Sequence, residues 1–277
     1  MRLRGDTAGY TCESQLTVNL MELKNKIIVV TGGGAGIGEA MVRRFKLEGA
    51  KSVVVADING DDAMRVARDI DGIGVQLDVS SESGITKLVD QTEREIGPID
   101  LFCSNAGILG SSDLTTPIDE WQQRWEVNVM PHIYAARAMV PRMIERGGGY
   151  LLNTASAAGL LNQIGSASYG VTKHAAVGFG EWVALTHAHQ GIKVSMLCPQ
   201  AVDTAMVSGD DPAVKAASVD GLLQPHEVAE AVVHGLHQET FLILPHPEVL
   251  TYLQRKASDY DRWISGMNRL QQKLESG

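Results

Sequence analysis

The sequence predicts an α/β fold: a single, doubly wound domain in which helices cover both faces of a seven-stranded parallel sheet. Three observations predict it. Short β-branched runs alternate with longer amphipathic stretches from Lys26 onward, no repeat or linker interrupts this alternation, and polar motifs follow the strands. With 277 residues, of which 44% are hydrophobic, the chain can bury one large core without a second domain.

The alternation places each element in turn. Strands are expected over 26–30, 52–57, 74–79, 100–107, 149–156, 193–199 and 241–245. Between them, helices are expected to end near Gly49 and to cover 60–70, 81–96, 118–146 and 167–190. Repeated βαβ units imply right-handed crossovers, and the ligand crevice of such a sheet lies beyond the carboxyl ends of its strands.

Two ends and one internal segment stand apart from this pattern. Residues 1–20 are expected to be a disordered extension, because Met21 would itself make a natural start and truncation there should leave folding intact. The main domain then covers 21–245. Within it, 206–224 carries loop signals, and the tail over 246–277 reads as one helix from about 248 to 274. Both segments are candidates for covering a site.

Composition limits the classes of partner. A formal net charge of −9 and a pI near 5.4 argue against nucleic acid or an anionic membrane, so the expected partner is a small molecule or another subunit. No segment has the length of a membrane span or the core of a signal peptide. Cys12, Cys103 and Cys198 are far apart, which favours neither a disulfide framework nor zinc and fits the cytoplasm. No metal site is expected, since His234 and His237 lack a third ligand nearby.

The stretch TGGGAGIG, residues 31–38, lies between the first strand and the first helix. Backbone N–H groups and the positive end of the helix dipole suit a pyrophosphate there, and glycines permit the close approach. Its spacing runs through Gly32, Gly36 and Gly38, and Ile37 stands where the common dinucleotide fingerprint has its last glycine. Taken alone, the loop is a weak signal, and no Walker lysine follows it.

Asp57 strengthens this interpretation. It ends the second strand, 19 residues after Gly38, where a carboxylate can accept hydrogen bonds from both adenosine ribose hydroxyls. A carboxylate would repel a 2′-phosphate, and no Arg or Lys lies in the glycine loop or directly after Asp57. NAD is therefore expected in preference to NADP. The alternative is that Asp57 only opens the turn that follows.

Tyr169 and Lys173 are four residues apart, on one face of a helix. The lysine ammonium is expected to lower the pKa of the tyrosine toward the range where a phenol works as a general base. Ser156 ends the fifth strand and can donate a hydrogen bond to a carbonyl or alkoxide oxygen. No G-x-S-x-G elbow surrounds it, so it is not expected to be a hydrolase nucleophile.

With these motifs in order, the chain resembles the short-chain dehydrogenase/reductase family, which has a Rossmann-like fold. The resemblance covers about residues 23–245. It rests on TGGGAGIG, Asp78-Val79, NAG at 105–107, Asn128, Ser156, Tyr169 and Lys173.

The resemblance implies roles for individual residues. Tyr169 would be the general acid/base, Ser156 would polarise the substrate oxygen, and Lys173 would bind the nicotinamide ribose. Asn128 would hold a water that relays protons. Further cofactor contacts are expected from Gly32, Gly36, Ile37, Gly38, Asp57, Ile58, Asp78, Val79, Asn105, Ala106, Gly107, Pro199 and Thr204. A homodimer or homotetramer is implied, with 118–146 and 167–190 as subunit contacts.

Two positions depart from the family. Ser104-Asn105 replaces a pair of asparagines, and Gln200 replaces the glycine that usually follows Pro199. A bulky amide beside the nicotinamide could touch the substrate or require another backbone angle. Substrate contacts are expected from Ser156, Leu160, Gln163, Tyr169 and Gln200, and the apolar residues of 158–165 favour an apolar alcohol or ketone.

The sequence therefore predicts an NAD-dependent oxidoreductase that transfers hydride between the nicotinamide and a secondary alcohol or ketone. Three alternatives stay open. They are a non-catalytic nucleotide-sensing or scaffold protein on the same fold, an NADPH-dependent carbonyl reductase, and an enzyme of internal redox such as an epimerase. The last usually carries a larger C-terminal domain than the chain after Pro245 provides.

Overall fold

The computed structural model describes residues 20–206 and 217–275. Its centre is a parallel sheet with the strand order β3-β2-β1-β4-β5-β6-β7. The strands are β1 (Ile27–Thr31), β2 (Ser52–Asp57), β3 (Ile73–Gln76), β4 (Leu101–Ser104), β5 (Gly149–Thr154), β6 (Ile192–Leu197) and β7 (Leu242–Ile243). The predicted seven-stranded, doubly wound α/β fold is confirmed. The order changes direction between β1 and β4, and this switch point opens the crevice in which such sheets bind ligands.

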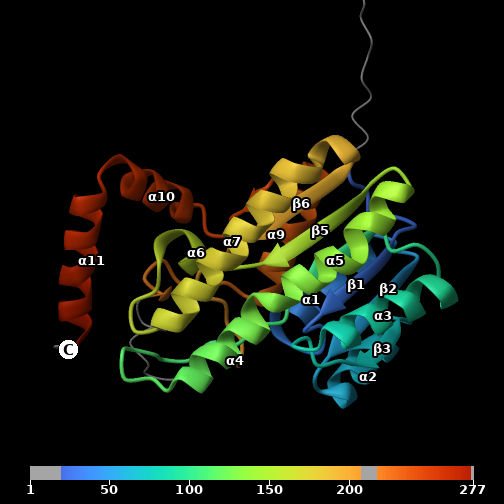
Figure 1. The fold of residues 1–277 in the computed structure, drawn as a ribbon, viewed down its shortest axis with the longest axis horizontal. Helices are drawn as coiled ribbons and strands as arrows, with labels where there is room; N and C mark the ends of the chain where they lie inside the picture. The colour runs from blue at the N-terminus through green and yellow to red at the C-terminus, as the bar shows by residue number, and fades with distance from the viewer. Residues whose placement is uncertain (1–19, 207–216, 276–277) are drawn as a thin grey trace, which may run out of the picture.

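Helices pack against both faces of the sheet (Figure 1). They are α1 (Gly36–Leu47), α2 (Gly60–Asp69), α3 (Glu82–Glu95), α4 (Ile118–Asn128), α5 (Met130–Glu145), α6 (Ala158–Leu161), α7 (Ala167–His187), η1 (Ala188–Gln190), α9 (Pro225–His237), α10 (Glu248–Ser258) and α11 (Tyr260–Glu275). Helices α1, α2 and α9 cover one face, while α3, α5 and α7 cover the other.

The strand β1 shows how the sequence builds two cores from one sheet. Successive side chains of a strand point to opposite faces. Ile27 and Val29 accordingly join the cluster under α3, α5 and α7, whereas Ile28 and Val30 join the cluster under α1, α2 and α9. A strand buried on both faces has no polar side, which is why β1 reads as a continuous apolar run.

Two predicted helices are each split in the structure. The helix expected over 118–146 breaks at Val129, where φ is −120° and ψ −56°, because Pro131 has no N–H to continue the ladder. The helix expected over 248–274 breaks at Asp259, which is extended and accepts the backbone N–H of Arg262 with 2.9 Å between nitrogen and Oδ1. That bond caps the start of α11.

The other differences concern short elements and the segments outside the described residues. The short helix α6 follows the fifth strand, and β3 ends at Gln76, so that Asp78 and Val79 lie beyond it. The expected extension over 1–20 lies almost wholly outside the described residues, as do residues 207–216 of the expected covering segment. Among the described residues, no helix is long and apolar enough to cross a membrane.

Candidate active site

The glycine loop between β1 and α1 has a backbone that only glycine can adopt. Gly32 and Gly36 have φ values of +64° and +54°, in the left-handed region. A Cβ on Gly38 would lie 1.9 Å from the Gly32 carbonyl oxygen. Ala35, which precedes α1, makes no side-chain cap, so the first N–H groups of the helix point into the loop without a side-chain acceptor. This cradle of N–H groups fits a pyrophosphate.

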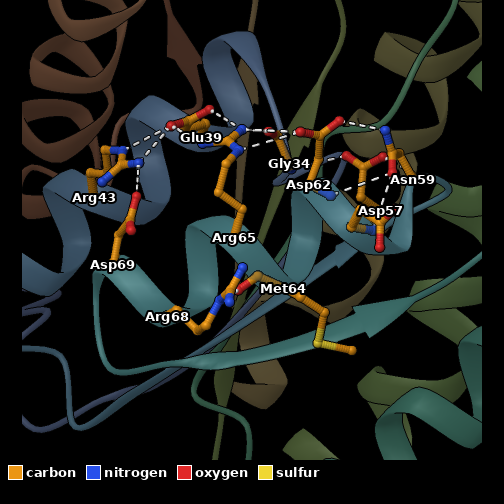
Figure 2. Close-up of polar contacts among 11 residues, drawn as sticks. Gly34, Glu39, Arg43, Asp57, Asn59, Asp62, Met64, Arg65, Arg68 and Asp69 are labelled. Atoms are coloured by element: carbon orange, nitrogen blue, oxygen red, sulfur yellow. Dashed lines mark hydrogen bonds and ion pairs between the residues drawn. The ribbon is translucent and has the colours of Figure 1, made fainter.

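The Asp57 carboxylate lies against this loop. Its Oδ2 accepts the Gly34 N–H at 2.9 Å, and its Oδ1 accepts the Asn59 N–H at 3.0 Å. Figure 2 shows Asp57 between these two residues. Each carboxylate oxygen keeps acceptor capacity for a further donor, such as a ribose hydroxyl. The end of β2 and the glycine loop therefore form one rigid corner.

Arg65, on α2, is a cation at this corner that the sequence reasoning missed. Its Nη2 donates to the Gly34 carbonyl at 2.9 Å. The same guanidinium forms ion pairs with Glu39 and Asp62, at 3.2 and 3.3 Å (Figure 2). Burial alone would raise the pKa of Glu39, but hydrogen bonds from Arg65 and Arg43 outweigh it and lower that pKa. Two carboxylates thus already compensate the charge of Arg65.

Asn105 joins three strands at the opening of the crevice. Its Nδ2 donates to the Thr31 carbonyl at 3.1 Å, and its Oδ1 accepts the Thr154 hydroxyl at 2.9 Å. The Thr31 hydroxyl in turn accepts the Asn105 N–H at 2.9 Å. Ala106 and Gly107, which follow Asn105, line the cavity.

Ser156, Tyr169 and Lys173 meet at one wall of the cavity. Ser156 follows β5 and is 7% exposed, with its hydroxyl 3.3 Å from the Pro199 carbonyl. Tyr169 and Lys173 project from the first turns of α7. The Lys173 Nζ donates to the Thr154 carbonyl at 3.1 Å and lies 5.5 Å from the centroid of the Tyr169 ring. A serine, a phenol and an ammonium therefore converge from two elements.

Burial decides the acid–base properties of this pair. It raises the pKa of Tyr169, although a hydrogen bond with Ser156 opposes the rise. It also lowers the pKa of Lys173 to about 8. The expectation that the ammonium would lower the pKa of the tyrosine does not hold for this structure, in which burial raises that pKa.

Asn128 lies behind the cavity wall and is fully buried. Its side chain pairs with both backbone groups of Ile108, at 2.8 and 2.9 Å, and its Nδ2 also donates to the Thr172 hydroxyl at 3.2 Å. The break at Val129 has a further effect. The His132 N–H donates to the Val129 carbonyl at 3.2 Å instead of the Asn128 carbonyl, its partner in a regular helix. The Asn128 carbonyl is therefore released from the helix ladder.

A cavity of about 840 Å³ unites the predicted residues. It is lined by every residue expected to contact the cofactor: Gly32, Gly36, Ile37, Gly38, Asp57, Ile58, Asp78, Val79, Asn105, Ala106, Gly107, Tyr169, Lys173, Pro199 and Thr204. Ser156, Gln163 and Gln200 also line it. Leu160 does not: it packs into the core, and the adjacent Leu161 reaches the cavity instead.

Gln200 holds a defined orientation. Its Nε2 donates to Asp220 Oδ2 at 3.1 Å, and its backbone N–H donates to His246 Nδ1 at 3.2 Å. Asp220 Oδ1 accepts the hydroxyl of Tyr252 at 2.9 Å. Since the amide nitrogen faces a carboxylate, the Gln200 Oε1 is the free acceptor, and it is buried without a partner among the described residues. Gln200 thus ties the end of β6 to the C-terminal helices.

The cavity reaches the C-terminal tail, which the sequence indicated as a candidate cover, and also α4, which it did not. Tyr252 and Arg255 of α10 and Trp263, Met267 and Leu270 of α11 line it, as do Gln123 and Val127 of α4. The apolar spacing of Trp263, Met267 and Leu270 was visible in the sequence, but its direction was not, because the break at Asp259 sets it.

Metal binding and thiol chemistry were also considered for the part of the chain that the structure describes. It contains no group of three or more His, Cys, Asp or Glu side chains that could hold a metal ion. Cys103 and Cys198 are buried free thiols, and burial raises the pKa of Cys198 to about 12. Cys12 lies outside the described residues.

Known proteins are similar to this chain in sequence and in fold. The model for short chain dehydrogenases matches residues 26–214. A 1-deoxy-11-beta-hydroxypentalenate dehydrogenase from Streptomyces exfoliatus is 34% identical over 254 residues, which cover 88% of this chain and 92% of that protein.

Two solved structures show the same fold. A short-chain dehydrogenase/reductase from Burkholderia phymatum in complex with NAD superposes with a TM-score of 0.81 at 26% identity, covering 87% of this chain and 96% of the other. A 7α-hydroxysteroid dehydrogenase complexed with NADH and 7-oxo glycochenodeoxycholic acid gives 0.74 at 27% identity, covering 80% and 94%. With its family-model match and this fold, the chain belongs to the short-chain dehydrogenase/reductase family.

Proposed function

We propose that this protein is an NAD-dependent oxidoreductase that interconverts a secondary alcohol and a ketone. The observation that carries the proposal is the position of Ser156, Tyr169 and Lys173 in the same cavity as the glycine loop and Asp57. A nucleotide site alone would not require a phenol, a serine hydroxyl and a buried ammonium at the far end of that cavity. This favours an enzyme over a nucleotide-sensing scaffold.

One group of residues would bind and position the cofactor, and another would transfer the proton. The nicotinamide, when bound, supplies the acceptor or donor of hydride. The glycine loop would hold the pyrophosphate and Asp57 the adenosine ribose, while Thr204 and Pro199, which line the same cavity, would contact the nicotinamide end. These contacts fix the reacting carbon relative to Tyr169, and such positioning contributes much of the rate of a two-substrate reaction.

Proton transfer falls to Tyr169. In reduction, the Tyr169 phenol gives its proton to the ketone oxygen and becomes a phenolate; in oxidation, the phenolate takes the hydroxyl proton of the substrate. Ser156 donates to the same oxygen and stabilises the charge that develops there. Lys173, 5.5 Å from the tyrosine ring, stabilises the phenolate once it forms. Asn128, behind the cavity wall at Ile108, would hold a relay water.

NAD is the proposed cofactor because of the charges around Asp57. A 2′-phosphate would meet the Asp57 carboxylate, and the nearby Arg65 is already paired with Glu39 and Asp62. A cation whose charge is compensated adds little attraction for a second anion. The competing candidate is an NADPH-dependent carbonyl reductase, which would need Arg65 to leave both carboxylates.

The proposed substrate is an apolar secondary alcohol. Leu109, Leu161 and Ile164 line the cavity beside Ser156 and Tyr169. The similarity to a dehydrogenase of a hydroxypentalenate and to one of a hydroxysteroid supports a cyclic substrate.

A homodimer or homotetramer is the proposed assembly. Helices α4 and α7 pack side by side, and together they expose five large apolar side chains: Ile118, Trp125, Val171, Trp182 and Leu185. Exposed apolar side chains gathered on two neighbouring helices support a subunit contact there.

The proposal is tested by screening cyclic and acyclic secondary alcohols with NAD and with NADP, following absorbance at the NADH band. NAD-linked oxidation of at least one alcohol is expected. If NADH binds tightly but no alcohol or ketone in a broad panel reacts, the protein is a nucleotide-binding scaffold instead.

A further inference from the structure

The last two helices form an arm, defined here as residues 248–275, that stands apart from the layered body. Figure 1 shows α10 leading away from the sheet and α11 running from its outer end, apart from the layered body, on the side where α6 lies. The main packing partner of α11 is α10. The arm joins the domain through one core: Val249 is buried in the cluster under α3, α5 and α7, and Tyr252, Leu253 and Trp263 pack against that cluster.

The inner face of α11 is apolar and is directed at the active site. Trp263, Met267 and Leu270 are spaced four and three residues apart, so they share one face of the helix. All three line the cavity that contains Ser156 and Tyr169. Ile264, the next residue on the helix, does not line it and is 58% exposed. The apolar face of a helix normally packs against a core, but this face of α11 lines a cavity.

The start of the arm is fixed to two walls of the site. The buried Lys256 donates from Nζ to the Leu160 carbonyl at 2.6 Å, which joins α10 to α6. The Tyr252 hydroxyl donates to Asp220, which also accepts the Gln200 amide. Because both anchors lie on α10, the position of α11 over the cavity is set by the residues that build the site.

We propose that the arm is the outer wall of the substrate site and that the substrate is a bulky, multi-ring secondary alcohol or ketone. Its reacting carbon lies at Ser156 and Tyr169, and its apolar body extends to Trp263 and Met267. This deepens the proposed function and depends on it. The occupant is assigned as substrate because the apolar face and the catalytic pair border one continuous cavity of about 840 Å³. Because the same cavity is also expected to hold the cofactor, the place of Trp263 and Met267 in its lining, rather than its volume, indicates a long apolar substrate.

The test compares substrates of increasing size in matched variants. Trp263→Ala and Met267→Ala, singly and together, remove apolar surface from the inner face, and Ile264→Ala removes a similar amount from the exposed side. For the double variant, kcat/KM for a tetracyclic hydroxysteroid is expected to fall about 30-fold, the effect of losing a buried aromatic anchor. Turnover of cyclohexanol is expected to change less than about threefold.

A control variant and a second inner-face variant distinguish loss of the substrate wall from general misfolding. Ile264→Ala should leave both substrates unaffected. Met267→Glu places a charge on the inner face, and it should reproduce the size-dependent loss while the melting temperature and NADH affinity stay near the wild-type values. An equal loss for cyclohexanol and the steroid, or no loss for either, would overturn the proposal.

The main competing occupant is a second copy of the chain, and light scattering distinguishes it. If the double variant, but not Ile264→Ala, changes the oligomeric state without size-selective loss, the inner face is a subunit interface and the proposal is wrong. Steroid binding by calorimetry provides a readout without turnover. If no alcohol is oxidised but the wild type binds a tetracyclic ketone and the double variant does not, the proposed function fails while the assignment of this wall survives.

Discussion

The backbone N–H of Gly34 donates to the Asp57 carboxylate across 2.9 Å, so the loop expected to hold the pyrophosphate and the carboxylate expected to hold the ribose form one hydrogen-bonded unit. Gly34 allows this contact because it has no side chain. A Cβ there would lie 2.9 Å from Asp62 Cβ and 3.0 Å from Asp57 Oδ2. Gly34 is thus needed for the contact with the Asp57 carboxylate rather than for binding the phosphate.

The substitution Gly34→Ala is expected to weaken NAD binding. The added methyl group must push Asp57 or α2 outward, and overpacking of this kind costs about 1–3 kcal/mol, or roughly a tenfold loss of affinity. Fluorescence titration with NADH measures it. The matched control is Gly266→Ala on α11, where the new Cβ would meet only Arg269 Nη2, at 3.8 Å. If Gly34→Ala binds NADH as the wild type does, the close packing at this corner is not required.

Replacing Asp57 by Asn is expected to shift the cofactor preference toward NADP. Both carboxylate oxygens accept backbone N–H groups, and a carboxamide can satisfy only one of them. Loss of a charged acceptor is worth about 1.5–3 kcal/mol, so kcat/KM for NAD should fall by roughly 10- to 100-fold. NADP should be used more readily once the repulsion is gone. Combining Asp57→Asn with Arg65→Met should abolish that gain if Arg65 is the cation that receives the phosphate.

Tyr169→Phe should abolish turnover and leave NADH affinity nearly unchanged. The ring still fills the same wall, but the proton donor is gone, and general acid–base catalysis contributes about 10²- to 10⁴-fold. Ser156→Ala keeps the phenol and should retain more activity than Tyr169→Phe. Stopped-flow measurement of NADH formation separates the chemical step from product release. Full activity in Tyr169→Phe would contradict the assignment of the general acid/base.

The fold and most of the cavity lining were predictable because both follow from short-range patterns. Short, continuous β-branched runs specify strands such as β1, which is buried on both faces, and the motifs at the carboxyl ends of the strands meet because parallel strands end at one edge. Asp57, Asn105 and Ser156, far apart in the sequence, therefore line one cavity.

What could not be predicted depends on single backbone breaks and on long-range packing. The break at Val129 releases the Asn128 carbonyl, and the break at Asp259 turns α11 toward the cavity. Arg65 lies on α2, the helix that follows Asp57 in the chain. No local sequence pattern shows that its guanidinium reaches back to Gly34. Leu160 and Leu161 are equally apolar, and only the geometry of α6 decides which one reaches the substrate side.

Leu185→Asp is expected to dissociate the proposed oligomer. Leu185 is 85% exposed on α7, next to the 56% exposed Trp182, and a charge at the centre of an apolar interface opposes association. Light scattering should give a lower mass than for the wild type. Leu47→Asp, at an 80% exposed position on α1, is the matched control and should leave the mass unchanged. If both variants keep the wild-type mass, α7 is not the interface.

His132 is expected to make the protein less stable in acid. The ring is 2% exposed, and burial, with help from the positive charge of Lys173, lowers its pKa from 6.5 to about 3. Below about pH 6.5 the unfolded chain binds a proton at this residue that the folded chain excludes, so stability falls as pH falls, by at most about 1.4 kcal/mol per pH unit. His132→Gln removes the titration, and urea unfolding between about pH 4 and pH 6 should show a curve that is flatter by that amount. His189→Gln, which removes an exposed imidazole, is the control. Parallel curves for His132→Gln and the wild type would show that His132 is not the buried neutral group that destabilises the fold in acid.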